Sequence, residues 1–285
     1  MEHCKILIDK VALLTQQKKI QKIINKTTIV FLVLLVSFAS TLAQTKNINY
    51  GNNPKAGHYT FVNGIKLYYE TYGSGEPLIM LHGNGGSIEA FSNQIPFFEK
   101  YYHVIAIDSR LQGKSGGSPD TISYSLMASD FNALLNQLHI DSAYVLGWSD
   151  GGINGLIMAL KYPDKVKKLA VSGANTVPDS TAFKYSDILG MKNFVENNTT
   201  ASKTEIALNK MMLYEPNISY DSLKQIRCPV LVMAGDHDII KLGHTLKIYQ
   251  SIPVAELCIY PNSHHNALQE HPKLFNQIVL TFFKK

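Results

Sequence analysis

Cysteine is scarce in this sequence of 285 residues, which has only three. So few cannot form the several bridges of a disulfide scaffold. Cys228 and Cys258 each stand beside or within an apolar run, which favours buried free thiols, although an export signal leaves a bridge between them possible. No spacing of cysteine and histidine resembles a zinc site, because the adjacent His264 and His265 suit joint metal ligation poorly.

Nucleotide-binding signatures are also missing. A glycine-rich turn at residues 81–86 reads LHGNGG, but no Lys-Ser or Lys-Thr follows it as in a P-loop. No G-x-G-x-x-G for a dinucleotide is present, and no repeat of fixed period points to a solenoid or a propeller. We therefore expect neither a nucleotide nor a metal as cofactor.

Net charge outside the first 43 residues is small. Those residues contain six lysines against Glu2 and Asp9, and so contribute four of the five net positive charges of the chain. The remaining residues are close to neutral, which argues against a nucleic acid or a membrane surface as partner. We expect a small-molecule substrate and no protein partner.

The first 43 residues resemble an export signal. A basic segment precedes the apolar run IVFLVLLVSFA at residues 29–39, and Thr41-Leu42-Ala43 supplies small residues for a cleavage after Ala43. An uncleaved membrane anchor is the alternative, although the run is shorter than the ~20 residues of a typical span. We expect a periplasmic or secreted protein, membrane-bound only if this segment is retained, with its folded domain at residues 44–285.

Apolar strand-like runs alternate with amphipathic helix-like stretches from residue 59 onward. This alternation predicts an α/β fold with a mostly parallel sheet and helices on both faces. The first two runs meet at Asn63-Gly64 and look like a hairpin, so the sheet should begin antiparallel. The runs after that turn are residues 65–72, 77–81, 103–107, 143–146, 168–171, 229–234 and 255–260, and the clearest helical stretches are 124–138, 151–162 and 271–283.

The region from about residue 176 to 222 departs from the alternation. It is polar, includes the stretch ENNTTASKTE and shows helical periods without a strand between them. We interpret it as a small helical cap over the ligand crevice, which in such sheets lies at the carboxyl ends of the strands. A long helical connection without a functional role is the alternative. Phe183, Tyr185, Met211, Met212 and Tyr214 are candidate apolar residues for lining a pocket beneath it.

The strongest chemical signal is GWSDG at residues 147–151, a G-x-S-x-G between an apolar run and a helix-like stretch. A sharp turn from strand to helix exposes the serine hydroxyl, and glycines two residues away on either side let backbone pass closely. Ser149 is the expected nucleophile. The helix that follows would direct the backbone N–H of Asp150 toward a developing oxyanion.

A serine hydroxyl needs a base and an orienting acid, which follow in the order Ser, Asp, His in this kind of fold. The strand-like run 229–234 leads into Gly235-Asp236-His237-Asp238, and we choose Asp238 over Asp236 as the acid, leaving the other to cap the loop. The last run leads into PNSHHN at residues 261–266, where either His264 or His265 can serve as base. In the turn at 81–86, the backbone N–H of Asn84 is the candidate second oxyanion donor.

Five segments together resemble the α/β-hydrolase fold family: HGNGG, IDSRLQGKSG, GWSDGG, AGDHDII and PNSHHNALQEHP, which span residues 81–272. Their placement implies Ser149 as nucleophile, Asp238 as acid and, from the spacing to the later His-Pro, His265 as base. The form GWSDGG, followed by K-Y-P and GAN, is similar to the branch that contains valacyclovir hydrolase, also called biphenyl hydrolase-like protein. Leu111 and Gln112 depart from the family's usual D-x-R-G-x-G-x-S, in a loop that is structural in most members.

The resemblance implies a serine hydrolase that cleaves small carboxylic esters, including amino-acid esters, through an acyl-enzyme and without cofactor. In that branch the aspartate after the serine receives the substrate's ammonium group, so Asp150 is a candidate for substrate binding. The alternative is that Asp150 contributes only its backbone N–H and caps the helix. The same fold also serves carbon–carbon bond hydrolases, cofactor-free perhydrolases and ligand-binding receptors with little turnover.

Overall fold

The computed structural model describes residues 21–22 and 48–285, of which residues 49–285 form one compact unit. The expected signal segment, residues 1–43, lies outside the described residues apart from residues 21 and 22. Its cleavage, and export of the protein, therefore stay predictions. In the described ranges, no helix combines the length and the apolar character that crossing a bilayer requires.

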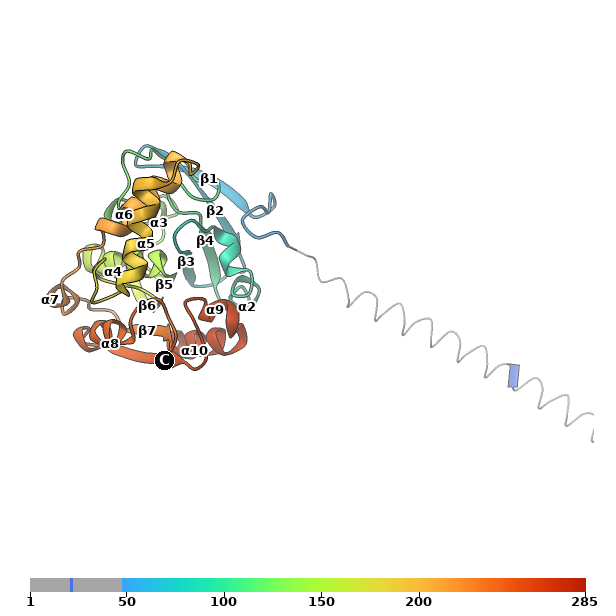
Figure 1. The fold of residues 1–285 in the computed structure, drawn as a ribbon. Coiled ribbons are helices and arrows are strands. Elements are labelled where there is room, and N and C mark those ends of the chain that lie inside the picture. Colours follow the sequence, from blue (N-terminus) through green and yellow to red (C-terminus); the bar gives the residue numbers. More distant parts are fainter. Residues whose placement is uncertain (1–20, 23–47) are drawn as a thin grey trace, which may run out of the picture. The chain divides into compact units, whose positions relative to one another are not determined.

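Eight strands form one sheet in the order β1-β2-β4-β3-β5-β6-β7-β8 (Figure 1). β1 and β2 are a hairpin in which Val62 pairs with Ile65, and β2 is antiparallel to β4 as well. All other neighbours are parallel, which confirms the α/β prediction and its antiparallel beginning. The strands are β1 (Gly57–Val62), β2 (Ile65–Tyr72), β3 (Pro77–Leu81), β4 (His103–Ile107), β5 (Ala143–Trp148), β6 (Val166–Ser172), β7 (Val230–Gly235) and β8 (Ala255–Tyr260).

Helices cover both faces of the sheet, with α3, α4 and α8 on one face and α2 and α10 on the other (Figure 1). This is why an interior strand such as β7 is buried along its whole length and is apolar without alternation. In α10, Phe275, Val279 and Phe282 recur at helical spacing and are all buried. The helices are η1 (Ile88–Phe91), α2 (Ile95–Phe98), α3 (Tyr124–Gln137), α4 (Asp150–Lys161), η2 (Pro163–Lys165), α8 (Leu242–Ser251), α9 (Ala267–Glu270) and α10 (Pro272–Lys284).

The segment between β6 and β7 holds three further helices: α5 (Tyr185–Asn197), α6 (Lys203–Tyr214) and α7 (Tyr220–Leu223). α5 and α6 pack side by side (Figure 1). A capping box starts α6, since the Ser202 hydroxyl accepts from the backbone of Glu205 and the Glu205 carboxylate accepts from the backbone of Ser202. α6 sends Leu208 into the main core, whereas α5 has no buried residue. The expected cap therefore corresponds to helices without a strand.

The parallel register places four strand ends at one edge of the sheet. Leu81 of β3 pairs with Gly147 of β5, and Trp148 of β5 pairs with Ser172 of β6. Farther along the sheet, Gly235 of β7 pairs with Tyr260 of β8. The segments that follow β3, β5, β7 and β8 start at residues 82, 149, 236 and 261, so the four candidate site segments emerge together.

Neither cysteine of the compact unit is in a disulfide, and Cys228 is buried while Cys258 is half-buried. Cys258 pairs with Met233 near the end of β7, whereas Cys228 precedes the start of that strand. The two thiols thus lie at different levels of the sheet.

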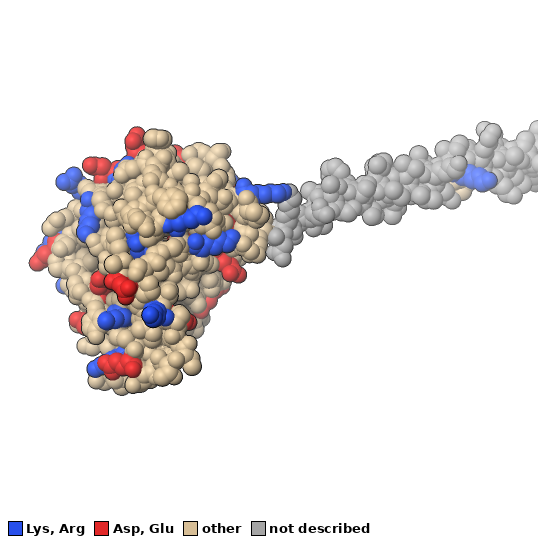
Figure 2. Space-filling view, turned by 90° about the horizontal axis from the view of Figure 1, so that it is seen from above, with Lys and Arg blue, Asp and Glu red and all other residues tan. Residues whose placement is uncertain are grey.

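On the face seen in Figure 2, basic and acidic side chains are intermixed among uncharged residues, as expected for a unit with little net charge.

Candidate active site

Ser149 occupies a strained turn between β5 and α4. Its φ of 55° and ψ of −120° are outside the regions that non-glycine residues normally adopt. The flanking glycines are required by close backbone contacts: a Cβ on Gly147 would lie 2.3 Å from the Gly151 carbonyl oxygen, and one on Gly151 would lie 1.8 Å from that of Leu81. The turn therefore holds the serine backbone in a conformation that presents its hydroxyl at the sheet edge.

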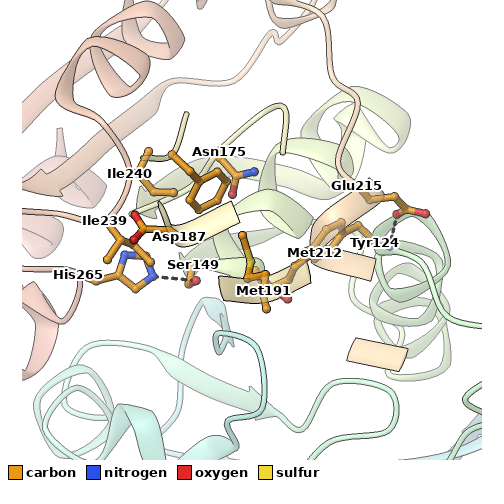
Figure 3. A pocket seen from close by; sticks show the side chains of 12 residues that line it. Tyr124, Ser149, Asn175, Asp187, Met191, Met212, Glu215, Ile239, Ile240 and His265 are labelled. Carbon is orange, nitrogen blue, oxygen red and sulfur yellow. Dashed lines mark hydrogen bonds between the residues drawn. The ribbon is translucent and has the colours of Figure 1, made fainter. Parts of the chain in front are cut away.

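The structure brings together the three side chains that the sequence puts forward as nucleophile, base and acid. The imidazole Nε2 of His265 lies 2.9 Å from the Ser149 hydroxyl (Figure 3). On its other side, Nδ1 lies 2.7 Å from Oδ1 of Asp238. The Asp238 side chain is 1% exposed and that of His265 17% exposed, so this hydrogen-bonded chain is largely shielded from water. The Ser149 hydroxyl, the His265 imidazole and the Asp238 carboxylate come from three separate loops and thus form a continuous hydrogen-bonded relay.

The two choices that the sequence left open are resolved by these distances. His264 pairs with Glu270 rather than with Ser149, its Nδ1 lying 3.2 Å from Oε1, and its side chain is 69% exposed. Asp236 accepts hydrogen bonds from the backbone N–H groups of Asn262 and Ser263. Asp236 is therefore the loop-capping aspartate, and His265 is the histidine placed against the serine.

Several neighbours restrict the position of His265. Gly173, just after β6, has a φ of +65°, and a Cβ there would lie 2.7 Å from Cε1 of the imidazole. The indole Nε1 of Trp148 donates to the backbone carbonyl of His265 at 2.9 Å. Oδ1 of Asp238 also accepts from the backbone of Ile240, which fixes the carboxylate. The imidazole is thus held by the Trp148 bond to its backbone and by Asp238, and Gly173 leaves the space that it occupies.

The two candidate oxyanion donors lie beside Ser149. A Cβ on Gly83 would lie 3.0 Å from the Cβ of Ser149, so the backbone just before Asn84 approaches the serine closely. Within residues 48–285, the backbone N–H groups of Asn84 and Asp150 have no hydrogen-bond acceptor. The Asn84 side chain instead donates to the Leu208 carbonyl of α6, joining this loop to the cap. Two free N–H groups next to a nucleophile can stabilise a negatively charged oxygen.

Asp150 is a buried acid at the first position of α4, only 4% exposed. Burial raises its pKa to about 6, and the nearby Tyr124 hydroxyl and Asn84 amide oppose that rise. Its Oδ2 is buried and has no hydrogen-bond partner among the described residues. A buried carboxyl oxygen without a donor has the capacity to accept a hydrogen bond from a ligand.

A cavity of about 360 Å³ opens onto Ser149 and His265 between the sheet edge and the cap (Figure 3). Three of its twelve lining residues are acidic and none is lysine or arginine, so the wall has one sign of charge. Its other residues are mainly apolar. The lining consists of Tyr124, Ser149, Asp150, Asn175, Phe183, Asp187, Met191, Met212, Glu215, Ile239, Ile240 and His265.

Two of the five apolar residues expected beneath the cap, Phe183 and Met212, do line this cavity. The other three were wrong. Tyr185 and Tyr214 are 72% and 64% exposed, and Met211 is 5% exposed within the main hydrophobic core. Neighbouring residues on a helix face different directions, and the sequence does not show which face of each cap helix meets the sheet. The residues that line the cavity therefore could not be chosen from the sequence alone.

Sequence reasoning missed most of the cavity wall. Ile239 and Ile240 directly follow Asp238, so their place beside the relay was a local signal that could have been used. Asp187 and Met191 come from α5, and Glu215 comes from the end of α6, where its carboxylate accepts from the backbone of Tyr124. No local pattern marks these residues, because only the packing of the cap directs them inward.

The loop at residues 108–115 is structural, as expected from the resemblance. The buried Asp108 carboxylate accepts from the backbones of Ile88 and Lys114. Arg110 forms a two-pronged ion pair with the buried Asp130 of α3. Among the described residues, no group of three or more histidine, cysteine, aspartate or glutamate side chains is arranged to hold a metal ion.

Comparison with known proteins agrees with this architecture. Residues 76–196 match a family model described as the alpha/beta hydrolase fold. The chain is 28% identical over 247 residues to the human protein named serine hydrolase BPHL, covering 78% of this chain and 84% of that one. It is 27% identical over 265 residues to a 2-hydroxy-6-oxononadienedioate/2-hydroxy-6-oxononatrienedioate hydrolase of Paraburkholderia phymatum, covering 76% and 91%.

The fold is shared with solved structures. A hydrolase from Pseudomonas aeruginosa superposes with a TM-score of 0.71 at 21% identity, covering 82% of this chain and all of the other. Fold, matched family and similarity to known hydrolases agree with the placement of serine, histidine and aspartate at the sheet edge. The chain is a hydrolase with the α/β-hydrolase fold, and its sequence is similar to hydrolases of that family.

Proposed function

We propose that this protein is a serine hydrolase that cleaves small carboxylic esters through a covalent acyl-enzyme, with Ser149, His265 and Asp238 as its catalytic residues. The observation that carries this proposal is the relay of 2.9 Å from the serine hydroxyl to His265 and 2.7 Å from His265 to Asp238. A serine hydroxyl becomes a useful nucleophile only when a base is positioned to take its proton. Here base and orienting acid are both in place.

The reaction has two halves. In acylation, His265 removes the proton of Ser149, the serine oxygen bonds to the ester carbonyl carbon, and the alcohol leaves with the proton that His265 returns. In deacylation, His265 takes a proton from water, the water oxygen bonds to the acyl carbon, and the serine oxygen leaves and regains its proton. The products are an alcohol and a carboxylic acid, and Asp238 holds the imidazole and stabilises its charged form.

Both halves pass through a tetrahedral intermediate with a negative oxygen. The backbone N–H groups of Asn84 and Asp150 are the proposed donors to it, supported by their lack of an acceptor within residues 48–285. The N-terminal end of α4 adds a favourable dipole at the same point. Removal of one such donor in a serine protease costs roughly 10²–10³-fold in rate, which is the scale expected for each donor here.

The cavity favours esters that carry a positive charge. Its acids Asp150, Asp187 and Glu215 are not balanced by any lysine or arginine in the lining. A wall with one sign of charge attracts ligands of the opposite sign and repels those of its own. We therefore propose amino-acid esters or similar amine-bearing esters as the preferred class, with Asp150 as the group that meets the amine.

Carbon–carbon bond hydrolysis of a dicarboxylate fits this cavity less well. The Paraburkholderia phymatum relative is named for dienedioate and trienedioate substrates, which carry two carboxylates. In this chain such a substrate would meet three acids and no lining cation. Unpaired like charges that are partly removed from water are costly, so the lining supports the ester proposal over that alternative.

The proposal is tested by Ser149→Ala assayed on p-nitrophenyl acetate, beside wild type. Loss of the nucleophile should lower kcat by at least about 10³-fold, because the relay then has nothing to deprotonate. Wild type should also react covalently with a fluorophosphonate at Ser149, detected by peptide mass spectrometry, and the variant should not. Unchanged hydrolysis by Ser149→Ala would refute the proposal, and tight ligand binding with negligible hydrolysis by wild type would favour a receptor.

A further inference from the structure

The loop that carries His265 is gripped by two carboxylates outside the catalytic relay. Asp236 follows β7 and Glu270 ends α9, and both bind residues 262–264. We propose that Asp236 and Glu270, here called the carboxylate clamp, are positioning residues that set His265 against Ser149 and Asp238. This inference rests on the proposed function, because it concerns the geometry of that catalytic base.

Asp236 joins the loop of the acid to the loop of the base. Its Oδ2 accepts from the backbone N–H of Asn262 at 3.0 Å, and its Oδ1 accepts from that of Ser263 at 3.0 Å. The backbone N–H of His237 returns a bond to the Ser263 carbonyl at 2.9 Å. Asp236 lies two residues before Asp238, and its partner Ser263 lies two residues before His265. The contact therefore fixes the separation of the two loops that supply acid and base.

A glycine makes this close contact possible. A Cβ on Gly235 would lie 2.1 Å from the Ser263 carbonyl oxygen and 2.4 Å from that of His264. Only a residue without a side chain lets the two backbones approach so closely. The end of β7 is thus in direct contact with the loop that precedes His265.

Glu270 closes the same loop from its far side. Its Oε2 accepts from the Ser263 hydroxyl at 2.8 Å and from the backbone N–H of His264 at 2.8 Å. Its Oε1 lies 3.2 Å from Nδ1 of His264, so that imidazole is engaged by Glu270. Ser263 is fully buried, so its hydroxyl has Glu270 in place of water. His265 is the residue that follows these held positions.

Both clamp carboxylates are stabilised in the ionised form that the clamp requires. The backbone N–H of Ser263 is the largest influence that lowers the pKa of Asp236. The backbone N–H of His264 is the largest influence that lowers the pKa of Glu270. A carboxylate that accepts several N–H bonds prefers to stay charged. An amide in either position would turn one acceptor into a donor that faces other donors.

The test compares kcat and KM for Asp236→Asn and Glu270→Gln on the ester that wild type hydrolyses. Small shifts of a catalytic group are able to cost on the order of 10²-fold in rate. We expect kcat to fall by about 10- to 100-fold, with KM within about threefold, because the cavity is untouched. Fluorophosphonate labelling of Ser149 should slow in parallel. Glu256→Gln is the matched control, since Glu256 is an exposed carboxylate paired with Lys285 near the start of β8, at the end of that strand away from the site, and it should keep wild-type kcat.

A double-mutant cycle separates positioning from general weakening of the fold. Ser263→Ala removes one hydroxyl from the Glu270 contact and leaves the backbone bonds, so it should fold even if Glu270→Gln does not. It should lower kcat severalfold in wild type and have less effect in Glu270→Gln, where the bond is already disturbed. The clamp would be overturned if Ser263→Ala and the folded variants Asp236→Asn and Glu270→Gln all kept wild-type kcat. It would also be overturned if the losses of kcat in Ser263→Ala and Glu270→Gln were additive in the double variant.

Failure of the clamp and failure of the proposed function give different results. If Ser149→Ala keeps its activity, the serine mechanism itself is wrong. If Ser149→Ala is inactive while folded Asp236→Asn and Glu270→Gln hydrolyse the ester at the wild-type rate, only the clamp is wrong.

Discussion

At the scale of single residues, the site depends on positions where a side chain is missing as much as on those where one is present. Gly173 has no reactive group, yet a Cβ added to it would collide with the His265 imidazole. Likewise, a Cβ on Gly83 would crowd Ser149 and one on Gly151 would collide with the Leu81 carbonyl. Catalytic geometry of this kind needs backbone to come within contact distance of the reacting groups, and a Cβ prevents it.

Gly173→Ala should therefore damage catalysis more than stability. The new Cβ would lie 2.7 Å from Cε1 of His265 and would displace the imidazole from Ser149. We expect kcat to fall by roughly 10²-fold, since a displacement near 1 Å is enough for that loss. The positive φ should add a destabilisation of about 1–2 kcal/mol. Steady-state kinetics and urea unfolding measure the two effects.

Gly190→Ala is the control for that substitution. Gly190 lies in α5, its φ is ordinary for a side chain, and no atom lies within 4 Å of a Cβ placed there. Alanine in a helix interior should raise the free energy of unfolding by about 0.5–1 kcal/mol relative to glycine. Kinetics of Gly173→Ala that match those of this control would contradict the role assigned to Gly173.

At the scale of elements, the acidic wall of the cavity is formed where α4 meets the cap. The N-terminal end of α4 contributes Asp150, while the cap contributes Asp187 from α5 and Glu215 from the end of α6. The strand ends supply the chemistry, and the cap supplies much of the wall around it (Figure 3). Residues of the cap can therefore vary in charge without disturbing the relay.

Amine-bearing esters should be preferred over neutral esters of the same size, and the preference should grow with pH. Asp150 has a pKa raised to about 6, so it is mostly neutral below pH 6 and charged above it. We expect the ratio of kcat/KM for an alanine ester over the matching propionate ester to rise about tenfold between pH 5 and 7, a range that lies below the ordinary α-amine pKa of about 7.7. Asp150→Asn should flatten this rise.

Phenyl esters of equal acyl length are suitable for that measurement, because both substrates release the same alcohol and share its signal. Taking a ratio at each pH cancels any pH effect on the catalytic steps that both substrates share. A ratio near one at every pH in wild type would remove the proposed preference for cations.

At the scale of the whole molecule, buried titratable groups oppose one another in the pH dependence of stability. Burial raises the pKa of Asp108 and of Asp150 to about 6 each, and lowers the pKa of His82 and of His244 to about 4 each. As pH rises from about 4 to 6, the folded carboxyl groups keep protons that the unfolded chain has lost, so they cost stability. Over about pH 4 to 6.5, the histidines contribute in the opposite direction.

Asp150→Asn should reveal one side of this balance. Between pH 5 and 7, the wild-type carboxyl ionises in the folded state although the unfolded carboxyl is already charged, which costs about 1 kcal/mol. The change in the free energy of unfolding from pH 5 to pH 7 should therefore be more positive in the variant than in wild type by about that amount. Urea denaturation of both proteins at the two pH values measures this difference.

His244→Gln provides the opposite case. The His244 imidazole accepts from the backbone of Thr176 and is neutral in the fold, so wild type gains stability from it as pH rises toward 6.5. Removal of that imidazole should reduce the gain. If both variants shift in the same direction, buried Asp150 and His244 are not the groups that control the dependence.

Much of the framework followed from local patterns in the chain. Alternating apolar runs predicted the strands within a few residues, and the turn GWSDG placed Ser149 between β5 and α4. Such patterns are visible because burial on two faces and helical periodicity act over short stretches. The position of Asp238 and of a histidine after the last two strands followed from strand order, since parallel strands end at one edge.

Tertiary packing decided what those patterns left open. Packing decides which of the two histidines meets Ser149, since His265 bonds to it whereas His264 bonds to Glu270. Which cap residues enter the cavity depends on how α5 and α6 are rotated, so Met212 lines it while neighbouring Met211 enters the core. Sequence alone determined the chemistry available at the sheet edge, because it arises within single turns. The structure decided geometry and charge around it, because these arise between segments far apart in the chain.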